Sequence, residues 1–264
     1  MPLVHLPHPE LPAYASGDAL LKARSLRDHL LRLRQGLARV FGGDWPRVTL
    51  YLLNEADWRS RLTLPYGYPA ARVRGELSVF APKGLPERLH FRILEAFTDA
   101  GVSPPGPLTE LVDLASGHEY AHALAVGRGL RAGARWADEL IANGLWTLGL
   151  SKADPETHSR LRRWAESLAR LPLSHPRPTR LAEELALAGR SLLACLEGTP
   201  RCREALEGLL AESPPPGAVR AMLEPWQRWL RPEGSRETRS RRSRKPGTSS
   251  ATGEETAPRR GRSS

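Results

Sequence analysis

Apolar residues recur every three or four positions along most of this chain, which is the spacing of one face of an α-helix. The first such run spans 18–41, and Gly42 and Gly43 end it. The same spacing predicts further helices over 86–101, 108–126, a stretch containing 136–143, 155–171, 179–197, 200–212 and 217–230. We therefore expect a largely helical protein.

Two shorter stretches favour β-strands. Residues 48–53 are mostly apolar, and residues 72–80 alternate between apolar and polar side chains. Asn54 between them is a suitable N-cap for a short helix that runs through Trp58. The proline-rich residues 1–17 show no clear period, so we expect an extended lead-in there.

The order of these elements predicts an α+β domain over residues 18–150. The plain apolar stripes that follow predict a helical region over 151–232 that packs on this domain. Residues 233–264 have no apolar period and are rich in Ser, Thr, Gly and Pro, which is typical of a disordered segment.

The stretch with the clearest chemistry is His118-Glu119-Tyr120-Ala121-His122, an instance of HExxH. On a helix, residues four apart lie on one face, so both imidazoles can bind one zinc ion. Glu119 is rotated about 100° from His118, which lets it act on a zinc-bound water as a general base. The flanks are apolar, and buried polar side chains are costly unless a partner such as a metal satisfies them.

HEYAH followed by Trp136-Ala137-Asp138-Glu139-Leu140-Ile141-Ala142 resembles the gluzincins, the zinc metallopeptidases that include thermolysin and the aminopeptidase N group. In that family a second helix supplies a glutamate from a pattern close to W-x-x-E-x-x-A, which Trp136, Glu139 and Ala142 match. The resemblance covers residues 47–150 or so. It implies one zinc ion held by His118, His122 and Glu139.

The resemblance also implies a fold and a mode of substrate binding. We expect a zincin-like domain in which a small sheet lies over the HExxH helix. In the family, the edge strand of that sheet binds the substrate as an added strand. By position, the edge strand here would be Arg74–Phe80.

One departure from the family concerns spacing. Sixteen residues, 123–138, separate His122 from Glu139, a slightly shorter gap than in the better-known gluzincins, so the connecting loop must be tight. Asp138 and Asp113 are the other carboxylates that could bind the metal, and Glu139 is favoured over both. The metzincins fit poorly, because the position of their third histidine is occupied by Arg128.

Two polar residues could orient the metal ligands from behind, as metal sites generally require. Asn143 lies four residues after Glu139 and on the same helix face. Asp113 lies five residues before His118, an offset of about 140° around the helix that is less favourable.

Gluzincins commonly stabilise the developing oxyanion with a downstream Tyr or His. This chain has no tyrosine after Tyr120. His175, in a proline-rich loop, and Tyr66 or Tyr68, in the loop before the expected edge strand, are the remaining candidates. The sequence leaves the choice among the three open.

The net charge of +10 is concentrated at the C-terminus, where residues 235–264 carry nine Lys/Arg and three Glu. Such a segment could bind nucleic acid or an acidic surface by neutralising phosphates. It contains no aromatic residue that could stack on bases, which favours a solubilising tail without a partner.

Compartment and membrane signals are absent from the sequence. The first residues lack a basic segment followed by an apolar run, and no stretch approaches the roughly 18 apolar residues of a membrane span. The only cysteines, Cys195 and Cys202, imply no disulfide framework. We expect a soluble cytoplasmic protein without a membrane span.

Two functions from different classes follow. The first is a zinc-dependent peptidase in which Glu119 activates the attacking water and the substrate is a peptide or protein. The second is a catalytically inactive zincin-fold protein that serves as a binding module or scaffold, with nucleic-acid contact through its tail. The intact motif favours the first, and the lack of a downstream tyrosine favours the second.

Overall fold

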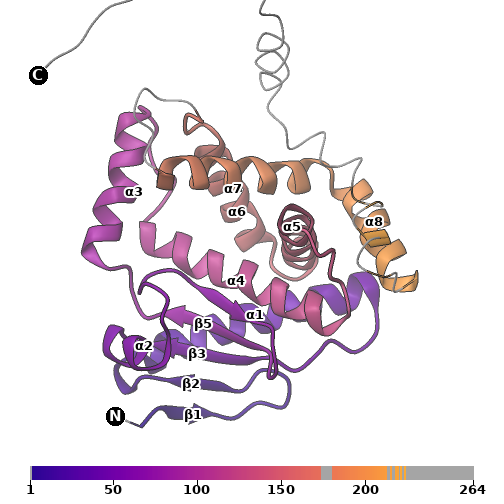
Figure 1. Ribbon diagram of the computed structural model, residues 1–264, viewed down its shortest axis with the longest axis horizontal. Coiled ribbons are helices and arrows are strands. Elements are labelled where there is room, and N and C mark those ends of the chain that lie inside the picture. Colours follow the sequence, from indigo (N-terminus) through magenta and orange to yellow (C-terminus); the bar gives the residue numbers. More distant parts are fainter. Residues whose placement is uncertain are drawn as a thin grey trace, which may run out of the picture. The chain divides into compact units, whose positions relative to one another are not determined.

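The described chain folds into an α+β architecture, as the pattern of elements predicts (Figure 1). The computed structural model describes residues 2–173, 180–212, 215, 218, 219, 221 and 223. Its strands are β1 (Val4–Leu6), β2 (Ala13–Ala15), β3 (Thr49–Leu53), β4 (Ala70–Arg72) and β5 (Ser78–Pro82). Its helices are α1 (Leu20–Phe41), α2 (Glu55–Arg61), α3 (Glu87–Asp99), α4 (Leu108–Gly127), α5 (Arg135–Ala153), α6 (Pro155–Ala169), α7 (Arg180–Glu197) and α8 (Thr199–Glu212).

The five strands form one mixed sheet in the order β1-β2-β3-β5-β4. β3 is parallel to both β2 and β5, and the outer pairs β1–β2 and β4–β5 are antiparallel. The lead-in expected over residues 1–17 therefore contributes two strands to the sheet. Each is three residues long, which is too short for an alternating pattern to be recognised.

The prediction that Arg74–Phe80 forms the edge strand is wrong. The regular strand begins only at Ser78, and it lies between β3 and β4 with all five of its residues buried. The chain turns back after Arg72, so that Ala70 pairs with Phe80 and β4 covers the side of β5 that would otherwise be open. The edge on this side of the sheet is therefore β4.

One face of the sheet is covered by helices (Figure 1). α4 packs on β4 and β5, and α1 packs on β2 and β3. Leu50, Leu52 and Val79 from this face are fully buried in the main core. The predicted helix at 108–126 is confirmed as α4, which lies directly against the sheet.

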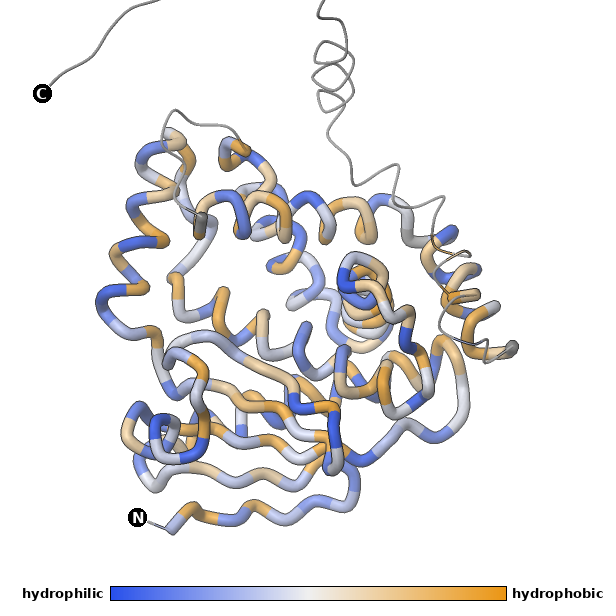
Figure 2. The backbone as a smooth tube through the Cα atoms, viewed as in Figure 1, coloured by the Kyte–Doolittle hydropathy of each residue, from blue (hydrophilic) through white to orange (hydrophobic). Residues whose placement is uncertain are grey.

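α5 is anchored against α1 by a close approach of the two backbones. A Cβ atom on Gly36 of α1 would lie 1.9 Å from the carbonyl oxygen of Gly149 in α5, so only glycine can occupy position 36. Every residue of α5 from Leu140 to Leu150 is buried, whereas α3 carries both apolar and polar residues along its length (Figure 2). Because α5 packs on several neighbouring helices, the position of its first turn relative to α4 is well defined.

The outer face of the sheet is partly covered by α2. Asn54 caps this helix as predicted, since its side-chain oxygen accepts the N–H of Asp57 at 2.9 Å. Trp58 of α2 is buried against Leu53 and Phe80 in a second, smaller apolar cluster. Among the described helices, α2 is the one that packs on this face.

Two further expectations concern the C-terminal half. The boundary expected after residue 150 falls inside α5, which continues to Ala153 before Pro155 starts α6. Most of the helix expected over 217–230, and all of the tail at 233–264, lie outside the described residues. Within the described part of the chain, no helix is long and apolar enough to cross a bilayer.

Candidate metal centre

α4 brings His118 and His122 onto one face, one turn apart, as the i,i+4 spacing requires. The helix is lined with small buried residues around the motif, including Gly117 and Ala121. A Cβ atom on Gly117 would lie 2.7 Å from Nε1 of Trp146, so the small residue lets α5 pack closely against the histidines. Both helices therefore converge on one point.

A tight loop over 128–134 joins α4 to α5 and makes the sixteen-residue gap possible. Gly129 and Gly133 take positive φ angles of 75° and 67°, a region that favours glycine. The Oδ1 atom of Asp138 accepts the N–H of Ala132 at 2.8 Å, which fastens the loop to the first turn of α5. Asp138, an alternative metal ligand by sequence, is thus engaged in holding the loop.

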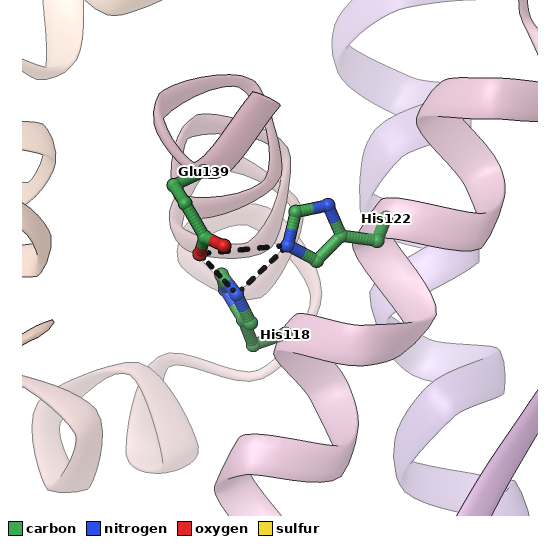
Figure 3. A group of neighbouring side chains, drawn as sticks. All are labelled: His118, His122 and Glu139. Atoms are coloured by element: carbon green, nitrogen blue, oxygen red, sulfur yellow. Dashed lines mark hydrogen bonds and ion pairs between the residues drawn. The ribbon is translucent and has the colours of Figure 1, made fainter. Parts of the chain in front are cut away.

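His118, His122 and Glu139 meet at the convergence of the two helices (Figure 3). Nε2 of His118 lies 3.0 Å from Nε2 of His122 and 3.0 Å from Oε2 of Glu139, and His122 Nε2 lies 3.6 Å from the same oxygen. Ligand atoms in a tetrahedral site with bonds near 2.0–2.1 Å are separated by about 3.3 Å. The three side chains could therefore hold one metal ion without rearrangement.

Electrostatics tie the same three groups together. Burial by itself would raise the pKa of Glu139, but the hydrogen bonds and charges of His118 and His122 outweigh it and bring that pKa well below its usual range. Burial by itself would lower the pKa of His122. The hydrogen bond that His122 donates to Glu139, together with the nearby Glu119 charge, outweighs burial and raises this pKa. The cluster thus keeps its carboxylate ionised, which is the form that binds a metal.

Glu119 lies beside the cluster and is held by the sheet. Its Oε2 atom accepts the backbone N–H of Ala71, in β4, at 2.8 Å. Burial raises its pKa, although the nearby histidines and this hydrogen bond act in the opposite direction. The carboxylate is therefore fixed between the edge strand and the two histidines.

The side chains of Asn143 and Asp113 have polar partners other than the three candidate ligands. The Asn143 amide donates to Oγ of Ser191 in α7 at 3.0 Å, and so links α5 to the C-terminal helices. Asp113 pairs with Nζ of Lys22 in α1 at 2.6 Å. Both side chains make contacts between helices.

The oxyanion candidates are also spread out. The Tyr66 hydroxyl accepts the Gly84 N–H at 3.1 Å, and its ring packs edge-on against Trp58 with 5.8 Å between ring centroids. Tyr68 is exposed in the loop that leads into β4. His175 lies outside the described residues. Among the described candidates, Tyr68 is the one whose side chain is free of such packing.

Sequence reasoning missed two neighbours of the cluster. Ala71 acts through its backbone, which carries no sequence signal. The Trp146 ring lies edge-on to His118, with 5.8 Å between centroids, and the apolar pattern of α5 marks Trp146 only as a core residue. Nδ1 of His118 is buried with no hydrogen-bond partner among the described residues.

His29 of α1 adds a buried ionisable group near Gly117 and predicts a pH effect on stability. Burial lowers its pKa to about 4. The positive charges of Arg32 and Arg160 lower this pKa further, and the negative charge of Asp154 raises it. Since the unfolded state keeps a pKa near 6.5, it binds more protons between these values. The free energy of unfolding should therefore fall as pH drops from 6.5 to 4, by about 3 kcal/mol from this group.

Urea unfolding of metal-free protein at pH 7 and pH 4 measures this effect. His29→Gln should lose distinctly less stability over that range than the unchanged chain, because the glutamine cannot take up the proton. The other acid-sensitive groups are common to both proteins and cancel in the comparison. Equal losses in the two proteins would contradict the assignment to His29.

No family model, curated protein or solved structure gives a significant match to this chain.

Proposed function

We propose that this protein is a zinc-dependent peptidase with a zincin-like domain. The observation that carries the proposal is the meeting of His118, His122 and Glu139 within 4.8 Å of one another, with the Glu119 carboxylate held next to them. A structural zinc site is usually closed by four protein ligands, whereas catalytic sites use three and leave one position open. Three ligands and an adjacent base match the catalytic kind.

The chain's own residues would divide the work of hydrolysis. When bound, zinc would lower the pKa of a water molecule and polarise the scissile carbonyl. Glu119 would accept a proton from the attacking water and deliver it to the leaving amine. The Ala71 N–H engages one oxygen of Glu119, which leaves the other oxygen for proton transfer.

β4 is the strand on which we propose an extended peptide would align. Ala71 directs its N–H away from β5 and toward Glu119, so its hydrogen-bonding groups face the candidate metal centre. A peptide added beside this edge would pair through its main chain with the outward carbonyl of Ala71, since the Ala71 N–H is already donated to Glu119, and would pass the metal. On this proposal the substrate would lie along β4, which the sequence did not predict as a strand.

The proposal is tested with the full chain loaded with zinc and incubated with a mixed peptide library. New termini detected by mass spectrometry should appear, and they should disappear when a chelator removes the metal. Stoichiometric zinc binding without any cleavage across broad libraries would overturn the peptidase and support the inactive binding or scaffold protein instead.

A proline at position 71 separates the role of the Ala71 N–H from that of the strand. In an antiparallel ladder, residues alternate between bonding the partner strand and pointing outward, and an outward N–H at an edge can be lost to proline. Ala71→Pro should keep the fold and the zinc content. A hydrogen bond to a charged group contributes about 1.5–3 kcal/mol, so hydrolysis should fall roughly tenfold to a hundredfold.

Arg72→Pro is the matched control, because the neighbouring N–H belongs to the β4–β5 ladder. That variant should lower the thermal midpoint, while Ala71→Pro should not. Unchanged hydrolysis in Ala71→Pro would show that Glu119 does not depend on the edge strand.

A further inference from the structure

The outer face of the sheet carries a cavity of about 360 Å³ on the side away from α1 and α4. Three arginines line it together with two aromatic rings and an acidic residue: Arg61, Arg72, Arg74, Tyr51, Phe80 and Glu76. Arg72 comes from β4, directly after Ala71, and Arg74 from the turn that follows. The cavity therefore adjoins the strand on which we propose the substrate aligns.

The cavity keeps a net positive charge, because its three arginines outnumber the one carboxylate that lines it, Glu76. The Glu76 carboxylate accepts the hydroxyl of Thr49, and Arg61 lies 3.4 Å from Oδ1 of Asp57. The Arg72 guanidinium lies over the Phe80 ring, 5.1 Å from its centroid. Neither Arg72 nor Arg74 forms an ion pair with a carboxylate of the described chain. Two guanidinium groups thus remain available for an anion.

The register of β4 connects this charge to a peptide. Successive side chains of a strand point to opposite faces, and directly opposed residues of neighbouring strands have Cβ atoms about 5 Å apart on the same face. A peptide strand beside β4 would direct every second side chain to the outer face, next to Arg72. Arginine binds carboxylates with two parallel hydrogen bonds, so an acidic side chain suits this position.

We infer that the pocket of Arg72 and Arg74 binds an Asp or Glu side chain of an extended peptide, and so gives the proposed peptidase a preference for acidic substrates. This inference rests on the proposed function. It makes Arg72 and Arg74 specificity-determining residues that touch the substrate away from the scissile bond.

Single-stranded nucleic acid suits this face less well. Aromatic rings bind bases through open flat faces. Here Tyr51 stacks on Tyr14 at 5.3 Å with 15° between ring planes, and on Phe80 at 4.8 Å with 11°. Arg72 covers Phe80 in addition. The flat faces are therefore occupied, and only the ring edges reach solvent.

Binding of labelled peptides, followed by fluorescence anisotropy, tests the inference independently of turnover. The protein is the zinc-loaded full chain with Glu119→Gln, and the probes are extended peptides that differ only by Glu or Gln at each position in turn. At one position, Glu should strengthen binding at least tenfold. Adding Arg72→Gln and Arg74→Gln should reduce that preference to less than twofold.

Arg24→Gln is the matched control, since Arg24 is an exposed arginine of α1 on the other side of the sheet. It should keep the preference. If the double variant unfolds, Arg74→Gln alone, in the exposed turn, should still weaken the preference. Equal binding of Glu and Gln peptides, or a preference that survives the double variant, would overturn the inference.

Two more measurements separate the possible failures. In one outcome, oligothymidylate binds the protein, the double variant loses that binding while Arg24→Gln keeps it, and Glu peptides are not preferred. The pocket then binds nucleic acid, and the inference is wrong. If acidic peptides bind as expected but wild-type protein cleaves none of them, the peptidase proposal fails and the acidic-peptide pocket stands. If the protein cleaves peptides but shows no preference for acidic ones, the peptidase proposal stands and the acidic-peptide pocket is wrong.

Discussion

Glu119→Gln should leave zinc binding intact and lower peptide hydrolysis by about 10²–10⁴-fold, the usual contribution of a general base. The glutamine keeps the size of the side chain, and its carbonyl oxygen can still accept the Ala71 N–H. It cannot accept a proton from water at neutral pH. The substitution therefore removes proton transfer while it preserves the contact with the edge strand.

The measurement has two parts, zinc content by mass spectrometry of metals and hydrolysis of a cleaved library peptide. Glu95→Gln is the control, because Glu95 is an exposed residue of α3 with the same change in charge. It should leave both quantities unchanged. Hydrolysis by Glu119→Gln at the wild-type rate would mean that another group activates the water, and the assignment of Glu119 would be wrong.

The site could be predicted from sequence to the extent that it depends on local spacing. His118 and His122 share a face because four residues make about one helical turn, and that holds in any tertiary context. Glu139 was expected from its resemblance to a known pattern, and the structure brings it to the histidines. The short loop before it was expected to be tight, and two glycines with positive φ make it so.

The remainder depends on contacts between distant segments. β4 is three residues long, and only its pairing with β5 identifies it as a strand. Ala71 meets Glu119 through its backbone, across 48 positions of sequence. Helical spacing predicts that Asn143 orients the metal ligands. In the structure, the Asn143 side-chain amide donates a hydrogen bond to Ser191 of α7. Helical spacing predicts on which side of a helix a residue lies, but it does not predict which residue of another element it contacts.

Glu139→Ala should abolish high-affinity zinc binding, since it removes one of the three proposed ligands and the negatively charged one among them. Loss of a group that merely orients a ligand weakens metal affinity by about 10–100-fold, and loss of the ligand itself should exceed that range. Zinc that binds only the folded state stabilises it by about 4 kcal/mol at a thousand times the dissociation constant. The rise in thermal midpoint on adding zinc should therefore disappear in the variant.

Asp138→Asn is the control that distinguishes the neighbouring carboxylates. The asparagine oxygen can still accept the Ala132 N–H, so the loop before α5 should keep its shape while the charge is lost. That variant should bind zinc within about tenfold of wild type, below the effect of losing an outer partner. Full zinc affinity in Glu139→Ala together with loss in Asp138→Asn would move the third ligand to Asp138. The match to the gluzincin pattern would then be coincidental, because the ligand would come from the wrong face of α5.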